Sequence, residues 1–305
     1  MKKRILVFLW TVLLFLGIFS PICAQAAERI NPNGEASLTL LYQKDGKVFP
    51  DLEIQIYRVA EAFEDGTFAL VAPFSNYPVN IHDITAQAQW DHVATTLVSY
   101  LVADGVVPDR TGVTDGEGTV RFEGLKTGLY LVRQVVAESE EGTWIFNRFM
   151  VYLPTPQPDG TLNYHVEARP KCTEFMSNTQ YTVRKLWQDT GNESGRPKDI
   201  VVGIYRDGVL QETKVLSNAN QWTYSWYVSL EDFGHWTVKE QSVPEPYKVT
   251  IQKNHSIFSI INTYDGEPGP PETGDSFTPL PWILGLCGSG ILLLLLGLYG
   301  RRRKE

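Results

Sequence analysis

Residues 181–187 read Tyr-Thr-Val-Arg-Lys-Leu-Trp, and this alternating stretch decides the fold that we predict for the chain. Val183, Lys185 and Trp187 share one phase, whereas Arg184 belongs to the other. Because side chains repeat every second residue in a β-strand, the stretch is typical of a strand with one buried face. Similar runs follow, separated by turn residues, at 201–205, 209–215, 222–228, 236–240, 247–252 and 257–264. Short strands at this spacing predict a β-sandwich over residues 181–265.

Residues 27–170 show the same strand-rich plan with one exception. Leu38, Leu40 and Tyr42 alternate with other residues, and further strands are predicted at 119–122, 129–136, 147–153 and 162–168. Between residues 83 and 103, apolar residues recur instead at three- and four-residue spacing, which is typical of an amphipathic helix. We therefore predict an all-β protein with two tandem immunoglobulin-like sandwiches, the first with an inserted helix. A polar connector at 171–180 joins them.

The N-terminal end of the chain has the pattern of a secretory signal peptide. Basic residues at 2–4 precede an apolar run at 5–19, and Ala24-Gln25-Ala26 supplies small residues before a cleavage site. We expect a signal peptide over residues 1–26, so that the mature chain lies outside the membrane.

The C-terminal end has the pattern of a membrane anchor. A Gly- and Pro-rich spacer at 266–278 leads into an apolar segment at 279–300 without charged residues. About 20 such residues span the hydrocarbon core of a bilayer as a helix. The basic residues at 301–305 favour a cytoplasmic tail behind it.

The composition between these ends excludes several functions. Residues 27–273 hold 20 lysines and arginines against 33 aspartates and glutamates, a net charge of −13, which leaves no basic surface for nucleic acid. Cys172 is the only cysteine there, so no disulfide stabilises the chain. The five histidines show no metal or catalytic-triad spacing, and no serine or cysteine has a nucleophile's context. We expect no metal, no cofactor and no enzyme with turnover.

Three polar residues in the second unit occupy positions where apolar side chains belong. Lys185 shares a phase with Val183 and Trp187, Glu240 with Trp236 and Val238, and Asn262 with Phe258 and Ile260. Burial of any one of them alone would cost several kcal/mol, about 3–5 for an unpaired ion. Two explanations stay open at this point: a buried ion pair with a hydrogen-bonded asparagine, or strand ends at which the alternation lapses.

A third explanation is chemical. Desolvation lowers the pKa of a lysine and raises that of a glutamate, so that a neutral amine and a neutral acid meet. The Lys185 amine would attack the Asn262 carboxamide carbon, while Glu240 polarises the carbonyl and transfers the proton to departing ammonia. The product is an isopeptide bond between the first and last strands of the unit.

Several motifs of this unit resemble the Cna B-type repeat of Gram-positive adhesins and pilins. They are Lys185-Leu186-Trp187, Arg196-Pro197, Tyr205-Arg206-Asp207-Gly208, Trp236-Thr237-Val238-Lys239-Glu240 and Ile261-Asn262-Thr263. The resemblance covers residues 181–264 and implies that Lys185, Glu240 and Asn262 form an intramolecular isopeptide bond.

The first unit resembles the N-terminal domain of sortase-assembled pilins, through residues 52–57, 114–118 and 128–130. The crosslink residues of that family are replaced here. Gln134 stands at the position of the glutamate, Ala168 and Arg169 at that of the asparagine, and Leu40 or Tyr42 at that of the lysine. Lys44 is in phase but adjoins a turn. We expect no isopeptide bond in this unit.

The stretch Pro270-Pro271-Glu272-Thr273-Gly274 resembles the Leu-Pro-x-Thr-Gly sorting signal of Gram-positive surface proteins, with Pro270 in place of the usual leucine. The resemblance implies cleavage between Thr273 and Gly274 by a sortase, with peptidoglycan or another subunit as the acceptor. The alternative is an ordinary single-pass anchor.

Lys171 follows Arg169-Pro170, and these residues resemble the Tyr-Pro-Lys motif of backbone pilins, with arginine in place of tyrosine. The resemblance implies that Lys171 accepts the threonine of the next subunit; the alternative is a linker lysine beside a proline. The function predicted from the sequence is a cell-wall-anchored structural pilin subunit on the outer surface of a Gram-positive bacterium. The alternative is a stand-alone, wall-anchored adhesin that binds a host matrix or cell-surface ligand.

Overall fold

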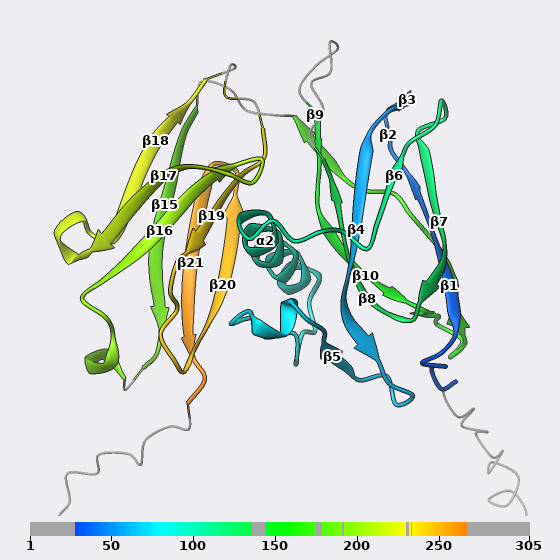
Figure 1. Cartoon of the computed structure of the whole chain (residues 1–305), viewed down its shortest axis with the longest axis horizontal. Coiled ribbons are helices and arrows are strands. Elements are labelled where there is room, and N and C mark those ends of the chain that lie inside the picture. Colours follow the sequence, from blue (N-terminus) through cyan, green and yellow to red (C-terminus); the bar gives the residue numbers. More distant parts are fainter. Residues whose placement is uncertain are drawn as a thin grey trace, which may run out of the picture. The chain divides into compact units, whose positions relative to one another are not determined.

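The computed structural model describes residues 28–135, 144–174, 179–190, 192–229, 232 and 234–266 (Figure 1). The predicted signal peptide, the sorting motif, the transmembrane segment and the basic tail lie outside these residues. Within the described residues, no helix combines the length and the apolar character needed to span a bilayer.

The first sandwich consists of residues up to Ala168, extended by a short strand at 172–174 in the predicted connector, and has two main sheets (Figure 1). One sheet has the order β13 (His165–Ala168), β1 (Glu35–Leu41) and β7 (Thr119–Lys126). The other has the order β10 (Phe149–Leu153), β8 (Gly128–Gln134), β4 (Glu53–Ala62) and β5 (Phe68–Leu70), with β6 (Arg110–Val113) also paired to β4. The unit also contains short two-stranded sheets. They pair β2 (Gln43–Lys44) with β3 (Lys47–Val48), β11 (Thr155–Pro156) with β12 (Leu162–Asn163), and β9 (Trp144–Phe146) with β14 (Cys172–Glu174).

The core between these sheets follows the predicted alternation. Leu38 and Leu40 are fully buried, and so is Tyr42 at 1 % exposure. The ring of Tyr42 packs edge-on against the ring of Phe146, with 4.8 Å between the ring centres. Phe149 and Ala168 are partly buried and pack at the margin of the same core. This core is built from apolar and aromatic side chains, as the sequence pattern predicts.

The second sandwich also has two sheets. One has the order β18 (Thr223–Val228), β15 (Thr179–Gln188), β21 (Ile257–Tyr264) and β20 (Tyr247–Asn254). The other has the order β17 (Val209–Ser217), β16 (Asp199–Arg206) and β19 (Trp236–Glu240). The connections among the described residues include the short 3-10 helices η1 (Phe74–Asn76), η2 (Glu193–Gly195) and η3 (Asn218–Asn220). The first and last strands of this sandwich, β15 and β21, are parallel neighbours.

The inserted helix, α2 (Gln87–Ala103), begins four residues later than the predicted Asp83. Asp83 has a φ of 58°, a left-handed conformation in which an α-helix cannot start. The side chain of Gln89 instead accepts hydrogen bonds from the backbone N–H groups of Thr85 and Ala86, and so defines the first turn. The presence of this helix within an otherwise all-β fold confirms the predicted fold class.

Helix α2 is more deeply buried than an amphipathic helix with one inward face. Every residue from Val93 to Leu101 is buried, because α2 contacts β10 of the first sandwich and β19 and β20 of the second (Figure 1). Backbone contacts strengthen this packing, since the Ile251 N–H donates to Thr96 Oγ1 at 2.7 Å. One hydrophobic cluster therefore runs from Tyr57 of the first sandwich through α2 to Ile260 of the second.

Candidate functional site

Lys185, Glu240 and Asn262 come together in the core of the second sandwich. The Lys185 Nζ atom lies 3.3 Å from Glu240 Oε2, and both side chains are fully buried. Asn262, also fully buried, donates a hydrogen bond from Nδ2 to Glu240 Oε1 at 3.1 Å. The carboxylate of Glu240 thus bridges the amine and the carboxamide.

Strand register explains this convergence. In the parallel pair β15 and β21, Lys185 lies opposite Ile260 and Trp187 opposite Asn262. Asn262 is therefore two positions beyond the partner of Lys185, on the same face of the sheet, within reach of a long side chain. Glu240 belongs to the other sheet, where it pairs with Val202, so its carboxylate reaches the pair from across the sandwich.

Burial shifts the pKa of both ionisable groups of the cluster toward the neutral form. Burial lowers the pKa of Lys185 to about 8, although the Glu240 carboxylate opposes that shift. Burial likewise raises the pKa of Glu240, against the effect of Lys185. Lys185 Nζ also lies 4.2 Å from the centre of the Trp187 ring, which shields it from water. A desolvated amine of this kind has a larger neutral, nucleophilic fraction at neutral pH than an exposed lysine.

Within the described part of the chain, Asn262 Oδ1 has no hydrogen-bond partner, and Lys185 Nζ and Glu240 Oε2 have only their mutual ion pair. Buried polar atoms are normally paired, because an unpaired one costs about 1–3 kcal/mol. These are also the atoms that amide exchange would use: the nucleophile, the proton carrier and the carbonyl oxygen.

A hydrogen-bond network closes one end of the same sandwich. The buried Asp189 carboxylate accepts hydrogen bonds from Arg196 and from the Tyr247 hydroxyl, the latter at 2.8 Å. Tyr247 accepts in turn from Asn192 at 3.1 Å. The hydrogen bond from Arg196 is the main cause that lowers the pKa of Asp189, which therefore stays ionised. The negative charge of Asp189 also favours the charged form of Lys185 and so opposes the lowering of its pKa by burial.

The corresponding positions of the first sandwich hold no such cluster. Leu40 pairs with Ala168 in the parallel strands β1 and β13, and Gln134 pairs with Ile54. Gln134 is buried and accepts a hydrogen bond from the Phe146 N–H at 2.9 Å. Lys44 is exposed and lies 3.4 Å from the carboxylate of Asp45. The first core thus presents an amide and apolar groups in place of an amine and an acid.

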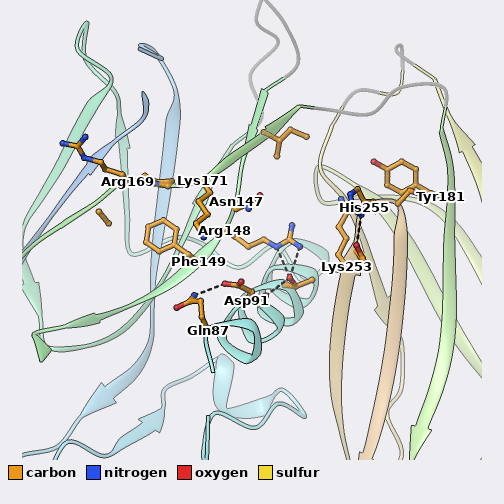
Figure 2. A pocket seen from close by; sticks show the side chains of 16 residues that line it. Gln87, Asp91, Asn147, Arg148, Phe149, Arg169, Lys171, Tyr181, Lys253 and His255 are labelled. Atoms are coloured by element: carbon orange, nitrogen blue, oxygen red, sulfur yellow. Dashed lines mark hydrogen bonds between the residues drawn. The ribbon is translucent and has the colours of Figure 1, made fainter. Parts of the chain in front are cut away.

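Lys171, the candidate acceptor, is exposed, and its carbonyl oxygen accepts the Asn147 N–H at 2.7 Å. It lines a cavity of about 650 Å³ that also contains Arg148 and Lys253 (Figure 2). The motifs of the sequence do not single out these two cations. A signal for Lys253 exists, because it continues the apolar phase of Tyr247, Val249 and Ile251 on β20. No group of three metal-binding side chains occurs in the described ranges.

Comparison with known proteins supports the resemblance of the second sandwich. Residues 181–263 match the model of the Cna protein B-type domain, which confirms the predicted similarity of this part of the chain. A search of curated proteins finds no match.

Solved structures of several Gram-positive surface proteins are similar to this chain at low identity. The single B repeat unit of the collagen binding surface protein Cna of Staphylococcus aureus is 17 % identical, with 76 % of this chain and 98 % of that one covered and a TM-score of 0.27. The full-length major pilin SpaD from Corynebacterium diphtheriae is 16 % identical, with 77 % and 65 % covered and a TM-score of 0.32. The minor pilin GBS52 of Streptococcus agalactiae is 14 % identical, with 78 % and 99 % covered and a TM-score of 0.26.

Proposed function

We propose that the chain is a structural, cell-wall-anchored pilin subunit whose second sandwich is stabilised by a self-formed isopeptide bond between Lys185 and Asn262. The observation that carries this proposal is the buried contact of Lys185, Glu240 and Asn262. The match of residues 181–263 to the Cna B-type domain supports a surface protein of this kind.

The buried contacts of Lys185, Glu240 and Asn262 support an amide exchange as the proposed reaction. The neutral Lys185 amine attacks the Asn262 carboxamide carbon, and a bond forms between Nζ and Cγ. Glu240 hydrogen-bonds the carboxamide and carries the proton from the amine to the departing nitrogen. The bond from Cγ to Nδ2 breaks, and ammonia leaves. Because fixed neighbours react with an effective molarity on the order of 10⁵ M or more, one turnover needs no enzyme.

Anchoring is the second part of the proposal. After export, a sortase cleaves between Thr273 and Gly274 and transfers Thr273 to an amine. The acceptor is peptidoglycan, or Lys171 of another subunit. The exposure of Lys171 supports the second route, because an acceptor amine must be reachable.

Two measurements test these parts separately. The intact mass of the mature chain, Ala27 to Thr273, should fall short of the sequence mass by about 17 Da, one ammonia, and a full-length mass would refute the bond. Wall extracts boiled in SDS with reductant should give a ladder that a Lys171→Arg variant abolishes. A single band from wild-type cells would exclude polymerisation and leave the wall-anchored monomer.

An adhesin is the second candidate function, and the cavity beside Lys171 favours it. This cavity lies at the junction of α2 with both sandwiches and has a size typical of ligand sites, which hold about 300–1,000 Å³. A pilin that only transmits force would not require it.

A further inference from the structure

The cavity is formed by five separate segments of the chain. Its walls are the first half of α2, residues 145–149 at the turn between β9 and β10, the stretch at 168–171, Tyr181 on β15, and residues 253–256 at the turn between β20 and β21 (Figure 2). Figure 2 shows Arg148 extending above α2, with Asp91 on one side and Lys253, His255 and Tyr181 on the other. The segments come from both sandwiches, so the site exists only in the folded pair.

Its lining is cationic in a strongly acidic protein. Arg148, Arg169, Lys171 and Lys253 line it together with His255, whereas Asp91 is the only carboxylate among the lining residues. Asp91 accepts a hydrogen bond from Gln87 at 3.0 Å. With a net charge of −13 for residues 27–273, a local excess of positive charge is unexpected by composition alone.

Two of the cations form no ion pair within the described residues, although the charge of Asp91 opposes the effect of burial on the pKa of Arg148. The Arg148 guanidinium donates to the neutral Thr95 Oγ1, at 2.9 Å from Nη2. Lys253 Nζ lies 5.5 Å from the Tyr181 ring and 5.1 Å from the Phe258 ring. Neither side chain forms an ion pair within the residues that the structure describes, whereas Arg169 has Glu167 at 3.6 Å. Partly buried cations without an anion are costly, and a bound anion would remove that cost.

Burial leaves Lys253 in an environment that disfavours its charge. Burial, followed by the charge of Arg148, lowers the pKa of Lys253 to about 7. A lysine at this value is charged only in part at neutral pH. An anionic ligand would restore its charge, because an opposite charge nearby favours the charged form.

We propose that this cavity binds an acidic sugar residue, with Arg148 and Lys253 holding its carboxylate. Arg148 offers the planar donors that suit a carboxylate, and Lys253 adds a point charge. Asn147, Tyr181 and Ser256 line the same cavity and supply hydrogen-bonding groups for sugar hydroxyls, while Phe149 supplies an apolar ring. This combination favours a hydroxyl-rich carboxylate over an extended acidic peptide. The inference specifies the ligand of the adhesin function and is independent of sortase assembly at Lys171.

The test uses the mature chain and two soluble probes, N-acetylneuraminic acid and glucuronic acid, each with its methyl ester. Calorimetry at pH 6.5 should show the acids binding and the esters binding about tenfold or more weaker, since each charged hydrogen bond contributes about 1.5–3 kcal/mol. Equal affinity of acid and ester, or no binding of either acid at millimolar concentration, would overturn the proposal without any variant.

Variants locate the site. Arg148→Gln and Lys253→Gln should each weaken acid binding about tenfold or more, whereas the exposed controls Arg121→Gln and Lys198→Gln should leave it unchanged. Thermal unfolding of each variant separates loss of the site from loss of the fold. One further result would reject the ligand class: tighter binding of the acidic peptide Glu-Pro-Gly-Pro-Pro-Glu, the sequence of residues 267–272, than of either sugar acid.

Affinity should depend on pH in a defined direction. Charged Lys253 is the binding form, so affinity falls as the pH rises through about 7, by about tenfold between pH 6.5 and pH 8.5. The other charged or titratable groups around it are Asp91, Arg148, Arg169, Lys171, His255 and His235, and burial lowers the pKa of His235 well below its usual value. The dependence should persist in His255→Gln and disappear in Lys253→Gln. The opposite pattern would assign the titration to His255 and refute the role of Lys253.

Discussion

In the first sandwich, the parallel strands β1 and β13 pair Leu40 with Ala168, whereas in the second, β15 and β21 pair Lys185 with Ile260 and place Asn262 beside it. The sheet that faces these strands also differs between the two sandwiches. In the first, β8 carries Gln134, which pairs with Ile54, whereas in the second, β19 carries Glu240, which pairs with Val202. The same strand plan therefore surrounds an apolar centre in one case and an ionisable one in the other.

The comparison shows how differently one architecture can be stabilised. In the first core, Phe49 and Tyr42 pack edge-on against Phe146, and no lysine enters. In the second, a lysine and a glutamate are buried together, which is rarely more stable than apolar packing of similar volume. A covalent product would explain why such an arrangement is kept.

Replacement of Glu240 by alanine should have the largest effect. It removes the proton carrier, so the bond should not form, and it leaves Lys185 buried without a counter-ion, a loss of about 3–5 kcal/mol beyond that of the bond itself. Intact mass should show no deficit of ammonia, and urea unfolding should shift strongly. Glu212→Ala, which removes a half-exposed glutamate on β17, is the control. A mass deficit that persists in Glu240→Ala would disprove the role given to Glu240.

Replacement of Asn262 by alanine should have the next largest effect. The bond would close a loop from residue 185 to residue 262, and a crosslink over that length contributes about 4 kcal/mol if it acts like a disulfide. The Lys185–Glu240 ion pair stays in this variant, so the loss is smaller than in Glu240→Ala. Asn254→Ala, at the exposed end of β20, should keep the deficit of one ammonia relative to its own sequence mass and should leave stability nearly unchanged. Equal stability of Asn262→Ala and wild type would mean that no crosslink stabilises the second sandwich.

The amino-acid pattern predicted most of this contrast, because both cores depend on two-residue alternation. Lys185, Glu240 and Asn262 were visible as polar residues in apolar phase, and the parallel pairing of the first and last strands brings two of them side by side. The distances depend on how one sheet faces the other, which alternation along a single strand cannot specify.

Helix α2 and the cavity show where sequence patterns fall short. The three- and four-residue spacing predicted one apolar face, but Thr95, Thr96 and Ser99 are buried as well. Their hydroxyls donate to carbonyl oxygens one turn earlier in the helix, so these polar residues tolerate burial between two sandwiches. Arg148 and Lys253 come from different sandwiches, and only the docked pair brings them together.

Replacement of Asp189 by asparagine should destabilise the second sandwich in a pH-dependent way. The loss of charged hydrogen bonds from Arg196 should cost about 2–3 kcal/mol at pH 7. Because the folded pKa of Asp189 is lowered, its contribution is complete above its unfolded pKa, about 4, and is lost as the pH falls through the folded value. Urea unfolding at pH 7 and pH 2.5 should therefore show a difference from wild type that shrinks in acid. A difference that stays constant would mean that packing, and not charge, dominates at this site.

Replacement of Gln134 by alanine tests the first core at the position related to Glu240. The buried Phe146 N–H loses its acceptor, which should cost about 2 kcal/mol, without any change in mass relative to the variant's sequence. Amide exchange at Phe146 should accelerate. Gln43→Ala, which removes an exposed side chain, is the matched control. A larger loss than that for Asn262→Ala would reverse the contrast between the two cores.

The smallest effect should come from the contact between α2 and the second sandwich. Lys239 on β19 pairs with Asp104 at the end of α2, and its amine lies 5.0 Å from the Tyr100 ring. Asp104 is 37 % exposed, and exposed ion pairs contribute about 0.2–1 kcal/mol. A double-mutant cycle with Lys239→Ala and Asp104→Ala should give a coupling in this range that weakens with salt. A coupling of several kcal/mol that resists salt would show that this ion pair, together with the buried face of α2, fixes the two sandwiches against each other.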